Sequence, residues 1–419
     1  MATITNLPTL NALFKTIYAD KVSDLVPSHE EILKNVSFVS NNQKNGGSYY
    51  QPVLLNREHG VTFLGESDSI INLEEPAVRQ STAAQIKGSA MTMRTYLSLT
   101  AISRAAKGPR AFVDATRYAV EGLTKGFASI QEQVHWHGRR GLGFGAVTTA
   151  TKIFTVDAAE FAEAIWVGAI GMQVEVRNGT AGAPGATVLA TAEITAVNMA
   201  TREITLSTVG SAVNATSYNI VRKGSYGVES YGLMSMLANT GSLFGIDAAA
   251  YDGWRANQYA VGGALSFANI SEAIALAQGR GLSGSIRGYV HPLVFRSLLP
   301  DYVALKTTGV PQSRILNESE SKNLAHGTKS VQFYVNSVET DIVASNYCKR
   351  GYAAFVNLDS LLRLGSTAPT FNLPGIAGSG EDYFVLKQDK NAAEIRMYSD
   401  EALFWDMPAS SIYFSGIVS

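Results

Sequence analysis

The clearest helical pattern in the chain lies at residues 109–137, which read PRAFVDATRYAVEGLTKGFASIQEQVHWH. Pro109 suits the first helical position, because the N–H that it lacks would have no partner there. Apolar side chains recur every three or four residues from Phe112 to Val134, as on the buried face of an amphipathic helix. Gly138 ends the pattern. At about 1.5 Å per residue the helix spans on the order of 40 Å, so we expect a rod that can organise a whole domain.

A charged stripe accompanies the apolar face of this helix. Its residues place opposite charges four positions apart, where they can pair along the helix surface. They are Arg110, Asp114, Arg117, Glu121 and Lys125. Gly122 and Gly126 share a face, although each costs about 1 kcal/mol relative to alanine in a helix interior. We expect a close neighbour at these glycines, or a bend.

Four basic side chains gather at the end of the helix, namely His135, His137, Arg139 and Arg140. His135 and His137 are the best candidate pair of metal ligands in the chain, but residues two apart on a helix do not share a face. Basic side chains at a helix C-terminus also complement the negative end of the helix dipole. The sequence therefore favours a basic helix end over a metal site.

The segment before the helix predicts an arm and a long hairpin. Residues 9–35 follow an amphipathic helical pattern that Pro27 interrupts. Two strand-like runs, Ser48–Leu55 and Gln85–Leu97, enclose about thirty mostly polar and acidic residues. Compact domains seldom keep so long a connection without a functional reason. We expect residues 48–97 to project as a hairpin whose apolar side chains need a partner to cover them.

The segment after the helix changes character twice. Gly141–Ala146 matches the outline of a dinucleotide-binding fingerprint, but it follows a helix and leads into β structure, so the sequence favours a flexible link. Residues 151–222 contain short alternating runs between turns, which predict a small all-β insert, either a barrel or a sandwich. Farther on, Asn269 and Glu272 have the spacing of a capping box, which predicts the start of a helix.

Composition favours assembly over a lone subunit. The chain has 419 residues, enough for two to three domains of about 150 residues. Its net charge of −1 provides no overall basic field to attract nucleic acid or an anionic membrane. Only 16% of residues are charged, against about 25% in an ordinary soluble domain, so we expect much of the surface to be hidden against other subunits. We expect no export signal and no membrane span, because no window holds the roughly 18 apolar residues required.

The sequence contains no recognisable catalytic or metal-binding pattern. Cys348 is the only cysteine, which excludes an intrachain disulfide, favours a reducing compartment and predicts a buried structural thiol. A Walker loop and a G-x-S-x-G elbow are absent from the sequence. Adjacent carboxylates on a strand point to opposite faces, so we expect three such pairs to be solvated or to contact another subunit. These pairs are Glu74–Glu75, Glu381–Asp382 and Asp400–Glu401. We therefore predict no enzyme activity, no metal and no cofactor.

The order of these parts resembles one family across nearly the whole chain. It is similar to the major capsid proteins of tailed double-stranded DNA bacteriophages, which have the Hong Kong phage-type capsid fold. Short phrases carry the resemblance: GGSYYQPV at 46–53, WVGAIG at 166–171, TREITL at 201–206 and YGLMSML at 231–237. The resemblance implies an α+β fold with the following parts: an N-terminal arm at 1–45, an extended loop at 46–98, a peripheral domain at 99–150 with the spine helix at 109–137, a β-barrel-like insertion domain at 151–222, a mainly axial domain at 223–375 and a return to the peripheral domain at 376–419.

The resemblance also implies a structural role. Copies of the chain are expected to self-assemble into hexamers and pentamers of an icosahedral head, which matures from a procapsid in the bacterial host cytoplasm and encloses double-stranded DNA. A scaffolding protein, a portal and decoration proteins are the other expected partners, and DNA is contacted without sequence specificity. Subunit contacts are expected on the extended loop, at Tyr49, Tyr50, Val53, Leu55, Val61, Phe63 and Leu64. Arg139 and Arg140 are hypothesised to face the genome.

Two other functions stay open at this point. An encapsulin-type compartment shell has the same fold and encloses cargo enzymes instead of a genome, although the β insert and the chain length favour the phage version. A β-rich soluble enzyme is the third interpretation. It would need two carboxylates brought together in a cleft, and it does not explain the long hairpin.

Overall fold

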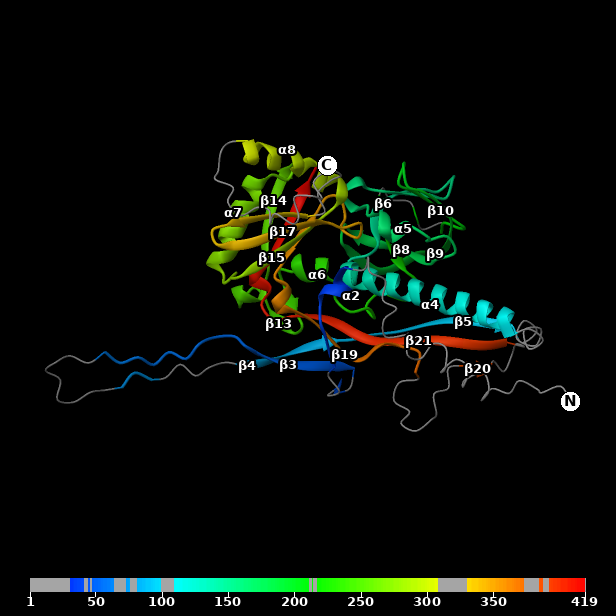
Figure 1. Ribbon diagram of the computed structural model, residues 1–419, viewed down its shortest axis with the longest axis horizontal. Coiled ribbons are helices and arrows are strands. Elements are labelled where there is room, and N and C mark those ends of the chain that lie inside the picture. Colours follow the sequence, from blue (N-terminus) through cyan, green and yellow to red (C-terminus); the bar gives the residue numbers. More distant parts are fainter. Residues whose placement is uncertain are drawn as a thin grey trace.

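The computed structural model describes residues 31–40, 44–45, 47–63, 73–75, 81–98, 109–210, 213, 217–307, 330–372, 384–386 and 392–418. Most of the predicted N-terminal arm, including the helical pattern before Glu31, therefore lies outside the described residues. Figure 1 shows two lobes above a long helix and a long flat sheet, with a hairpin that leaves the body at one end. None of the helices in the described ranges is long and apolar enough to cross a membrane.

The longest helix, α4, spans Pro109–His137, as predicted. It packs on a five-stranded sheet, against β5 (Ser89–Ser98) and β21 (Ala392–Trp405). Strand β21 is the hub of this sheet, because it pairs with β5, with β19 (Leu361–Thr370) and with β20 (Phe384–Leu386). β1 (Phe38–Ser40) pairs with β19 in parallel. The sheet therefore joins segments that are far apart in the chain beneath one helix (Figure 1).

The projecting hairpin consists of β3 (Ser48–Leu54) and β4 (Ser81–Lys87), which pair antiparallel along their length. The short strand β2 (Lys44–Asn45) pairs with β3. At the base of the hairpin, Tyr49 and Ile86 are buried in a core cluster that also contains Trp136 and Trp405. The described residues beyond β3 run away from the body (Figure 1). The predicted hairpin is therefore correct for β3 and β4 and wrong for residues 89–97, because these form β5 and pair with β21 inside the body.

Six strands close into a barrel in the order β10-β7-β6-β11-β8-β9. They are β6 (Gly143–Thr148), β7 (Ile153–Val156), β8 (Gln173–Thr180), β9 (Ala183–Asn198), β10 (Glu203–Leu206) and β11 (Tyr218–Arg222). The interior is apolar and contains Phe154, Ile194 and Ile220. Of the two predicted forms of the β insert, the barrel is the correct one.

The barrel begins earlier than predicted, because the Gly-rich segment after α4 is part of it. Strand β6 pairs with both β7 and β11, so residues 143–146 are not the flexible link that the sequence favoured. Gly145 lies so close to β7 that a Cβ there would collide with the backbone of Thr155. The glycines in this segment therefore permit close strand packing, which a local pattern does not distinguish from a linker.

The second lobe is built on a six-stranded mixed sheet in the order β14-β22-β18-β15-β17-β16. The strands are β14 (Asn257–Gly263), β15 (Ser285–Val290), β16 (Ser330–Val335), β17 (Val338–Ala344), β18 (Ala353–Val356) and β22 (Ile412–Ile417). Helices α7 (Phe267–Gly279) and α8 (Pro292–Thr307) share an apolar core with this sheet through Ile274, Val294 and Leu298. A second core, with α6 (Leu233–Leu237) and Trp136 of α4, includes Tyr289 and Tyr413 of the same sheet. Helices therefore cover both faces of the six-stranded sheet.

Helix α7 begins one turn before the predicted capping box. Ser266 is its N-cap and accepts a hydrogen bond from the backbone N–H of Asn269. Glu272 instead accepts a hydrogen bond from the Tyr259 hydroxyl at 2.7 Å. The predicted helix is correct and its predicted cap is wrong. The other described elements are short: α2 (Glu31–Asn35), α5 (Glu163–Trp166), β12 (Ser242–Leu243), β13 (Ile246–Asp247) and the 3₁₀-helices η2 (Ala158–Glu160), η3 (Asp252–Trp254), η5 (Leu358–Ser360) and η6 (Pro408–Ser410).

Two glycines of the spine helix and its end give a matched pair of substitutions. A Cβ on Gly138 would lie 2.3 Å from the carbonyl oxygen of Ser230. Gly138→Ala is therefore expected to lower stability by about 1–3 kcal/mol. A Cβ on Gly122 would meet no described atom within 4 Å, so Gly122→Ala is expected to raise stability by about 1 kcal/mol. Urea unfolding of the two variants checks this prediction. Changes in unfolding free energy with the same sign for both variants would contradict it.

Candidate functional site

A buried ionic cluster lies where α4 ends, between the barrel and the six-stranded sheet. We call it the exit cluster, and its members are Arg140, Glu160, Lys349 and Tyr352. Lys349 Nζ donates to Glu160 Oε2 at 2.8 Å and to the carbonyl oxygen of Gly141 at 3.1 Å. The Tyr352 hydroxyl donates to Glu160 Oε1 at 2.5 Å, and Arg140 Nη2 lies 3.8 Å from the same oxygen. One carboxylate of the barrel therefore holds groups from α4's exit and from the adjoining sheet.

The protonation states in the exit cluster follow from burial and from neighbouring charge. Burial alone would raise the pKa of Glu160, but Lys349 and Arg140 outweigh it and lower this pKa to about 2. Burial also lowers the pKa of Lys349, against the opposing effect of Glu160. Burial and the charge of Lys349 together hold the pKa of His137 well below its ordinary value. His137 is therefore neutral near pH 7, and it does not supply the positive charge that the sequence predicted for this helix end.

A second carboxylate fastens the barrel to the six-stranded sheet. Glu163 Oε2 lies 2.5 Å from His291 Nε2, and Glu163 Oε1 accepts a hydrogen bond from Arg350 at 2.5 Å. Burial would raise the pKa of Glu163, but these two hydrogen bonds lower it to about 2. Glu160 and Glu163 lie in the same connection between β7 and β8, so the barrel is attached at two adjacent points.

The spine helix is attached to the five-stranded sheet through Glu401 of β21. His135 Nε2 lies 2.7 Å from Glu401 Oε1, Gln131 donates to the same oxygen, and Arg363 lies 3.7 Å from it. The side chains of His135 and Glu401 are each 1% exposed. Burial would raise the pKa of Glu401, and the hydrogen bond from His135 lowers it. The prediction that the Asp400–Glu401 pair is solvated or touches another subunit is therefore wrong for Glu401, because its partner lies on α4 of the same chain.

The first described helix, α2, is held by the side chain of Glu132. The backbone N–H groups of Ile32 and Leu33 donate to the two carboxylate oxygens of Glu132, at 2.8 and 3.1 Å. Trp136 Nε1 also donates to Glu132, at 2.9 Å. Glu132 thus satisfies backbone donors that a helix start leaves free, one turn from the buried Trp136. The end of the arm is therefore tied to the spine helix.

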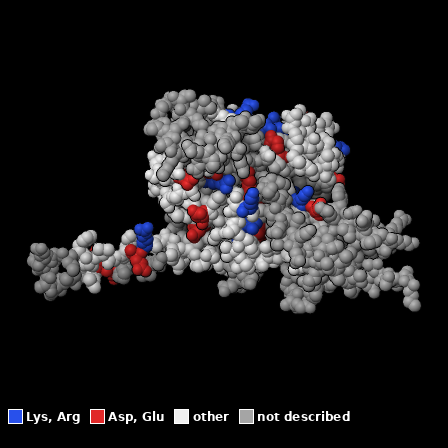
Figure 2. Space-filling view, viewed as in Figure 1, with Lys and Arg blue, Asp and Glu red and all other residues white. Residues whose placement is uncertain are grey.

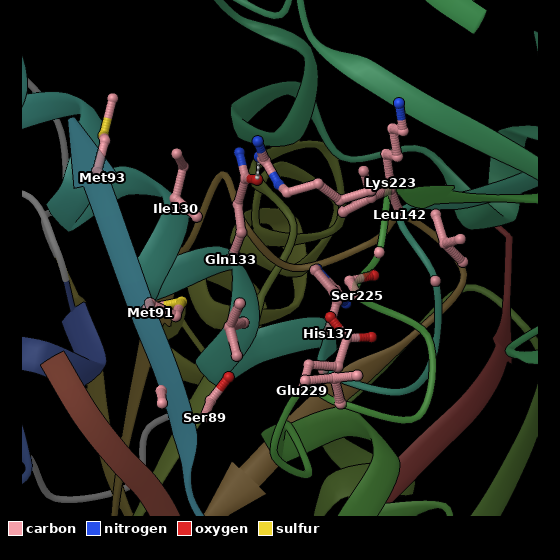
Figure 3. Close-up of a pocket in the computed structure, with 18 of the residues that line it drawn as sticks. Ser89, Met91, Met93, Ile130, Gln133, His137, Leu142, Lys223, Ser225 and Glu229 are labelled. Carbon is pink, nitrogen blue, oxygen red and sulfur yellow. Dashed lines mark hydrogen bonds between the residues drawn. The ribbon is translucent and has the colours of Figure 1, made fainter. Parts of the chain in front are cut away.

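A pocket of about 350 Å³ lies between α4, β5 and the turn after β11. Figure 3 shows Ser89, Met91 and Met93 of β5 on one side and Lys223, Ser225 and Glu229 on the other. Arg222 Nη2 donates to Gln133 at 2.9 Å across the pocket end. Glu229 accepts a hydrogen bond from the backbone N–H of Arg139 at 2.8 Å, and burial raises its pKa to about 7. This pocket therefore contains one carboxyl that titrates near neutral pH.

Glu229 is expected to make the stability of the folded chain depend on pH. Its pKa in the folded chain lies above its ordinary value of 4.5, so the folded state holds the proton more tightly, and stability from this group falls as pH rises from about 4.5 through about 7. The glutamine of Glu229→Gln cannot ionise, so this variant does not lose stability as pH rises. Its unfolding free energy relative to the wild type is therefore expected to increase from pH 5 to pH 8. Thermal unfolding at both pH values measures the change. An equal difference between variant and wild type at the two pH values would contradict it.

Metal binding has no support in the described ranges, where no three His, Cys, Asp or Glu side chains group closely enough to hold an ion. Cys348 is buried, as predicted, and burial raises the pKa of its thiol far above the ordinary value. A thiol of this kind is protonated and unreactive.

No family model matches the sequence, and no curated protein matches it. A chain in the capsid asymmetric unit of cyanophage A-1(L) matches the structure with a TM-score of 0.53 and 10% identity, and the match covers 93% of each chain. The chain has the Hong Kong phage-type capsid fold. The resemblance stated from the sequence is therefore confirmed at the level of the fold.

Two further solved structures have TM-scores too low to establish a shared fold. The capsid of the native GTA particle gives 0.44 at 8% identity and covers 94% of this chain and 91% of the other. The holo-SrpI encapsulin complex from Synechococcus elongatus gives 0.39 at 10% identity and covers 94% and 90%. The assignment of the capsid fold depends on the cyanophage structure alone.

In this capsid fold, the residues predicted for the extended loop divide into two groups. Tyr49 and Val53 are buried at the hairpin base, and Leu55 packs partly against the same core. Tyr50, Val61 and Phe63 are exposed, and Phe63 reaches 92%. Leu64 lies outside the described residues. The candidate contact surface is therefore the outer part of the hairpin, to which the structure adds Leu54 and Leu73, both exposed.

The charged stripe of the spine helix is described only toward its C-terminal half. Glu121 is half-buried and Lys125 is exposed. The side chains of Arg110, Asp114 and Arg117 lie outside the described part of the capsid fold. A close neighbour was expected at Gly122 and Gly126. Gly126 has one, the Met93 side chain of β5, whereas no described atom lies close to Gly122.

Arg140 corrects the prediction of a genome-facing side chain in this capsid fold. It is 5% exposed, and its guanidinium group stacks over the Tyr352 ring at 4.4 Å. A side chain this little exposed does not form part of an open inner surface, so the prediction of a genome-facing side chain is wrong for Arg140. Arg139 is half-buried, its Nε donates to the carbonyl oxygen of Glu229, and its guanidinium group lies 4.1 Å above the Tyr231 ring. The carboxylates Glu132, Glu160, Glu163 and Glu401 have no sequence signal, because most of their partners come from distant segments.

Proposed function

We propose that the chain is the subunit of a self-assembling shell, the head of a tailed bacteriophage. The observation that carries this proposal is the hairpin on a capsid fold. Phe63 is 92% exposed and Leu73 is 80% exposed, and both belong to the segment between β3 and β4 that extends away from the body (Figure 1). Apolar side chains placed so far from their own core favour burial by another molecule. The low charge content of the chain supports the same conclusion.

In this proposal each part of the fold has a mechanical role. The hairpin is the extended loop that overlies an adjacent subunit, α4 is the spine of the peripheral domain, and the six-stranded sheet with α7 and α8 is the axial domain. The barrel is an insertion domain whose first strand is β6, earlier than the boundary at 151. Residues 1–45 form an arm toward another neighbour. The carboxylates Glu160, Glu163 and Glu401 join these parts to one another, which suits a shell subunit.

The proposed contact residues are the exposed ones on the hairpin. They are Tyr50, Leu54, Val61, Phe63 and Leu73. The stripe at Arg110, Asp114, Arg117, Glu121 and Lys125 is proposed as the charged face of the spine helix. The proposed partners are other copies in hexamers and pentamers, a scaffolding protein, a portal, decoration proteins and non-specifically held double-stranded DNA. Assembly takes place in the bacterial host cytoplasm, and the subunit is structural, with no enzymatic role.

Electron microscopy of the chain expressed alone tests the proposal. Closed shells, tubes or capsomer rings, with a matching early peak on a sizing column, are the expected result. A small monomer that stays monomeric after a co-expressed scaffolding protein is added would contradict it. Shells that enclose cargo enzymes and never DNA, in cells that also make a portal and a terminase, would favour the encapsulin-type compartment instead.

A further inference from the structure

A second pocket lies on the other side of the helix exit from the pocket of Figure 3. It has a volume of about 390 Å³ and opens between the barrel and α6. Arg139 and Arg140 line it, together with Gly182 and Pro184 of the barrel and Tyr226 and Tyr231. A Cβ on Gly182 would lie 3.0 Å from the guanidinium group of Arg140, so the absence of a side chain there leaves room beside this cation. We call this space the arginine pocket.

The surroundings of the arginine pocket carry more positive than negative charge. Four cations lie at the helix exit, namely Arg139, Arg140, Arg222 and Lys349, and the carboxylates that face them in the described part of the chain are Glu160 and Glu229. Glu229 supplies less than a full negative charge near pH 7, because burial raises its pKa to about 7. The end of α4 adds only about half a negative charge. The excess of at least one positive charge in a largely buried region favours a bound anion.

The two arginines also have donors to spare. Arg140 Nε is buried and has no hydrogen-bond partner among the described residues. Over the same ranges, Arg139 uses its backbone N–H, its Nε and the face toward the Tyr231 ring, and its two Nη atoms have no hydrogen-bond partner. A guanidinium fork of this kind matches the two oxygens of a carboxylate. The pocket is therefore chemically suited to a carboxylate.

We propose that the arginine pocket binds a glutamate carboxylate from the projecting hairpin of a second copy of this chain, an inference that rests on the proposed function. Residues 58–75 contain five acidic residues and no lysine or arginine. Of these, Glu58, Glu74 and Glu75 are exposed, next to the exposed Arg57, and Figure 2 shows acidic groups outnumbering basic ones along the described part of the hairpin. The hairpin leaves the body at the end opposite the barrel, so it points away from its own pocket (Figure 1). Charge complementarity and direction therefore both favour a hairpin from another copy.

A charge swap tests the proposal. Arg139→Glu reverses the pocket rim, and the triple change Glu58→Lys, Glu74→Lys and Glu75→Lys reverses the hairpin. Each alone is expected to lower the yield of shells about tenfold or more, because like charges then face each other at the contact. Both changes in one chain restore opposite charges in every copy, so the yield is expected to return to within about threefold of the wild type. Lys152→Glu, at an exposed cation of the barrel away from the pocket and the hairpin, is the matched control and should assemble normally.

Two outcomes would overturn the proposal while leaving the proposed function intact. Both require that the wild type forms shells. In the first, the triple hairpin variant also assembles normally. In the second, the combined variant assembles no better than the single changes. An Arg139→Glu chain that assembles normally but retains less of a short DNA duplex would assign the pocket to phosphate groups instead.

A second measurement tests the contact without assembly. A fluorescent peptide of residues 55–80 is titrated into the full chain at nanomolar concentration, below that at which shells form, and its anisotropy is followed. Binding is expected, and Arg139→Glu or the triple-lysine peptide should weaken it about tenfold. If the wild-type chain never forms shells, the proposed function fails, and this titration still decides the inference. A peptide that binds the wild type and Arg139→Glu equally would overturn it.

Discussion

Glu160→Gln is expected to destabilise the subunit by about 3–5 kcal/mol, because it leaves Lys349 and Arg140 buried without their shared carboxylate. Lys349 is 0% exposed, so water cannot replace the lost partner. The glutamine keeps the shape of the side chain, so the effect reports charge and not packing. Urea unfolding followed by tryptophan fluorescence measures the loss, since Trp166 and Trp136 lie in the two cores that the exit cluster joins.

Matched variants separate this effect from a general cost of substitution. Glu193→Gln changes an exposed carboxylate of the same barrel and is expected to alter stability by less than about 0.5 kcal/mol. Adding Lys349→Met to Glu160→Gln removes one of the two stranded cations and should recover part of the loss. A double variant as unstable as the sum of two large single effects would show that Glu160 and Lys349 do not act as a pair.

The same substitution predicts a pH dependence of definite sign. Because the folded pKa of Glu160 is about 2, below the ordinary value of 4.5, its stabilising effect is fully present above about pH 4.5 and is lost as pH falls toward 2. The stability difference between the wild type and Glu160→Gln should therefore be largest at pH 6 and shrink at pH 4. A difference that grows on acidification would contradict the assignment.

Deletion of residues 58–75, with a short Gly-Ser link, is expected to abolish shell formation and to leave a folded subunit. These residues carry Val61, Phe63 and Leu73, which are exposed and contribute little to the body. The deletion has to spare β4, because Ala84 and Ile86 are buried at the hairpin base. A cut through residue 84 would therefore unfold the base and confuse assembly with folding. The deleted chain is expected to keep its unfolding free energy within about 0.5 kcal/mol.

Sizing chromatography, electron microscopy and thermal unfolding of one preparation check this deletion. Phe63→Ser alone should weaken assembly, and Val188→Ser, at an exposed apolar residue of the barrel, is the matched control. Intact shells from the deleted chain would show that the hairpin is dispensable. A deleted chain that no longer unfolds cooperatively would show that the outer hairpin supports the body.

Local patterns predicted the elements whose partners are close in sequence or whose period is strong. The helix at 109–137 was predicted to the residue, because Pro109 and Gly138 mark its ends and its apolar period is unbroken. The β insert was predicted as well, from alternation and turns. The Gly-rich segment after α4 was misinterpreted as a link, since glycine allows both a flexible chain and two strands in close contact, and the sequence does not distinguish these.

The candidate site was predicted much less well, for a physical reason. Lys349 and Glu160 are 189 residues apart, and His135 and Glu401 are 266 apart, so no local spacing indicates either pair. Arg140 was hypothesised to face the genome, as one of the basic residues at the end of the helix. It is inside because Glu160 and the rings of Tyr352 and Tyr413 surround its guanidinium group. The hairpin was predicted from two strand-like runs that enclose an unusually long connection, a signal that needs no partner from a distant segment.

The position of β21 and β22 constrains the order of events on the ribosome. β21 is the hub of the five-stranded sheet, and β22 lies between β14 and β18 in the six-stranded sheet, yet both are translated after all the other described strands. Neither sheet can close until residues 392–417 have left the exit tunnel. A nascent or truncated chain therefore lacks the complete five-stranded and six-stranded sheets, although β3 and β4 of its hairpin have already been translated. We therefore expect a chain that stops before β21 to be unable to offer its neighbours a finished body.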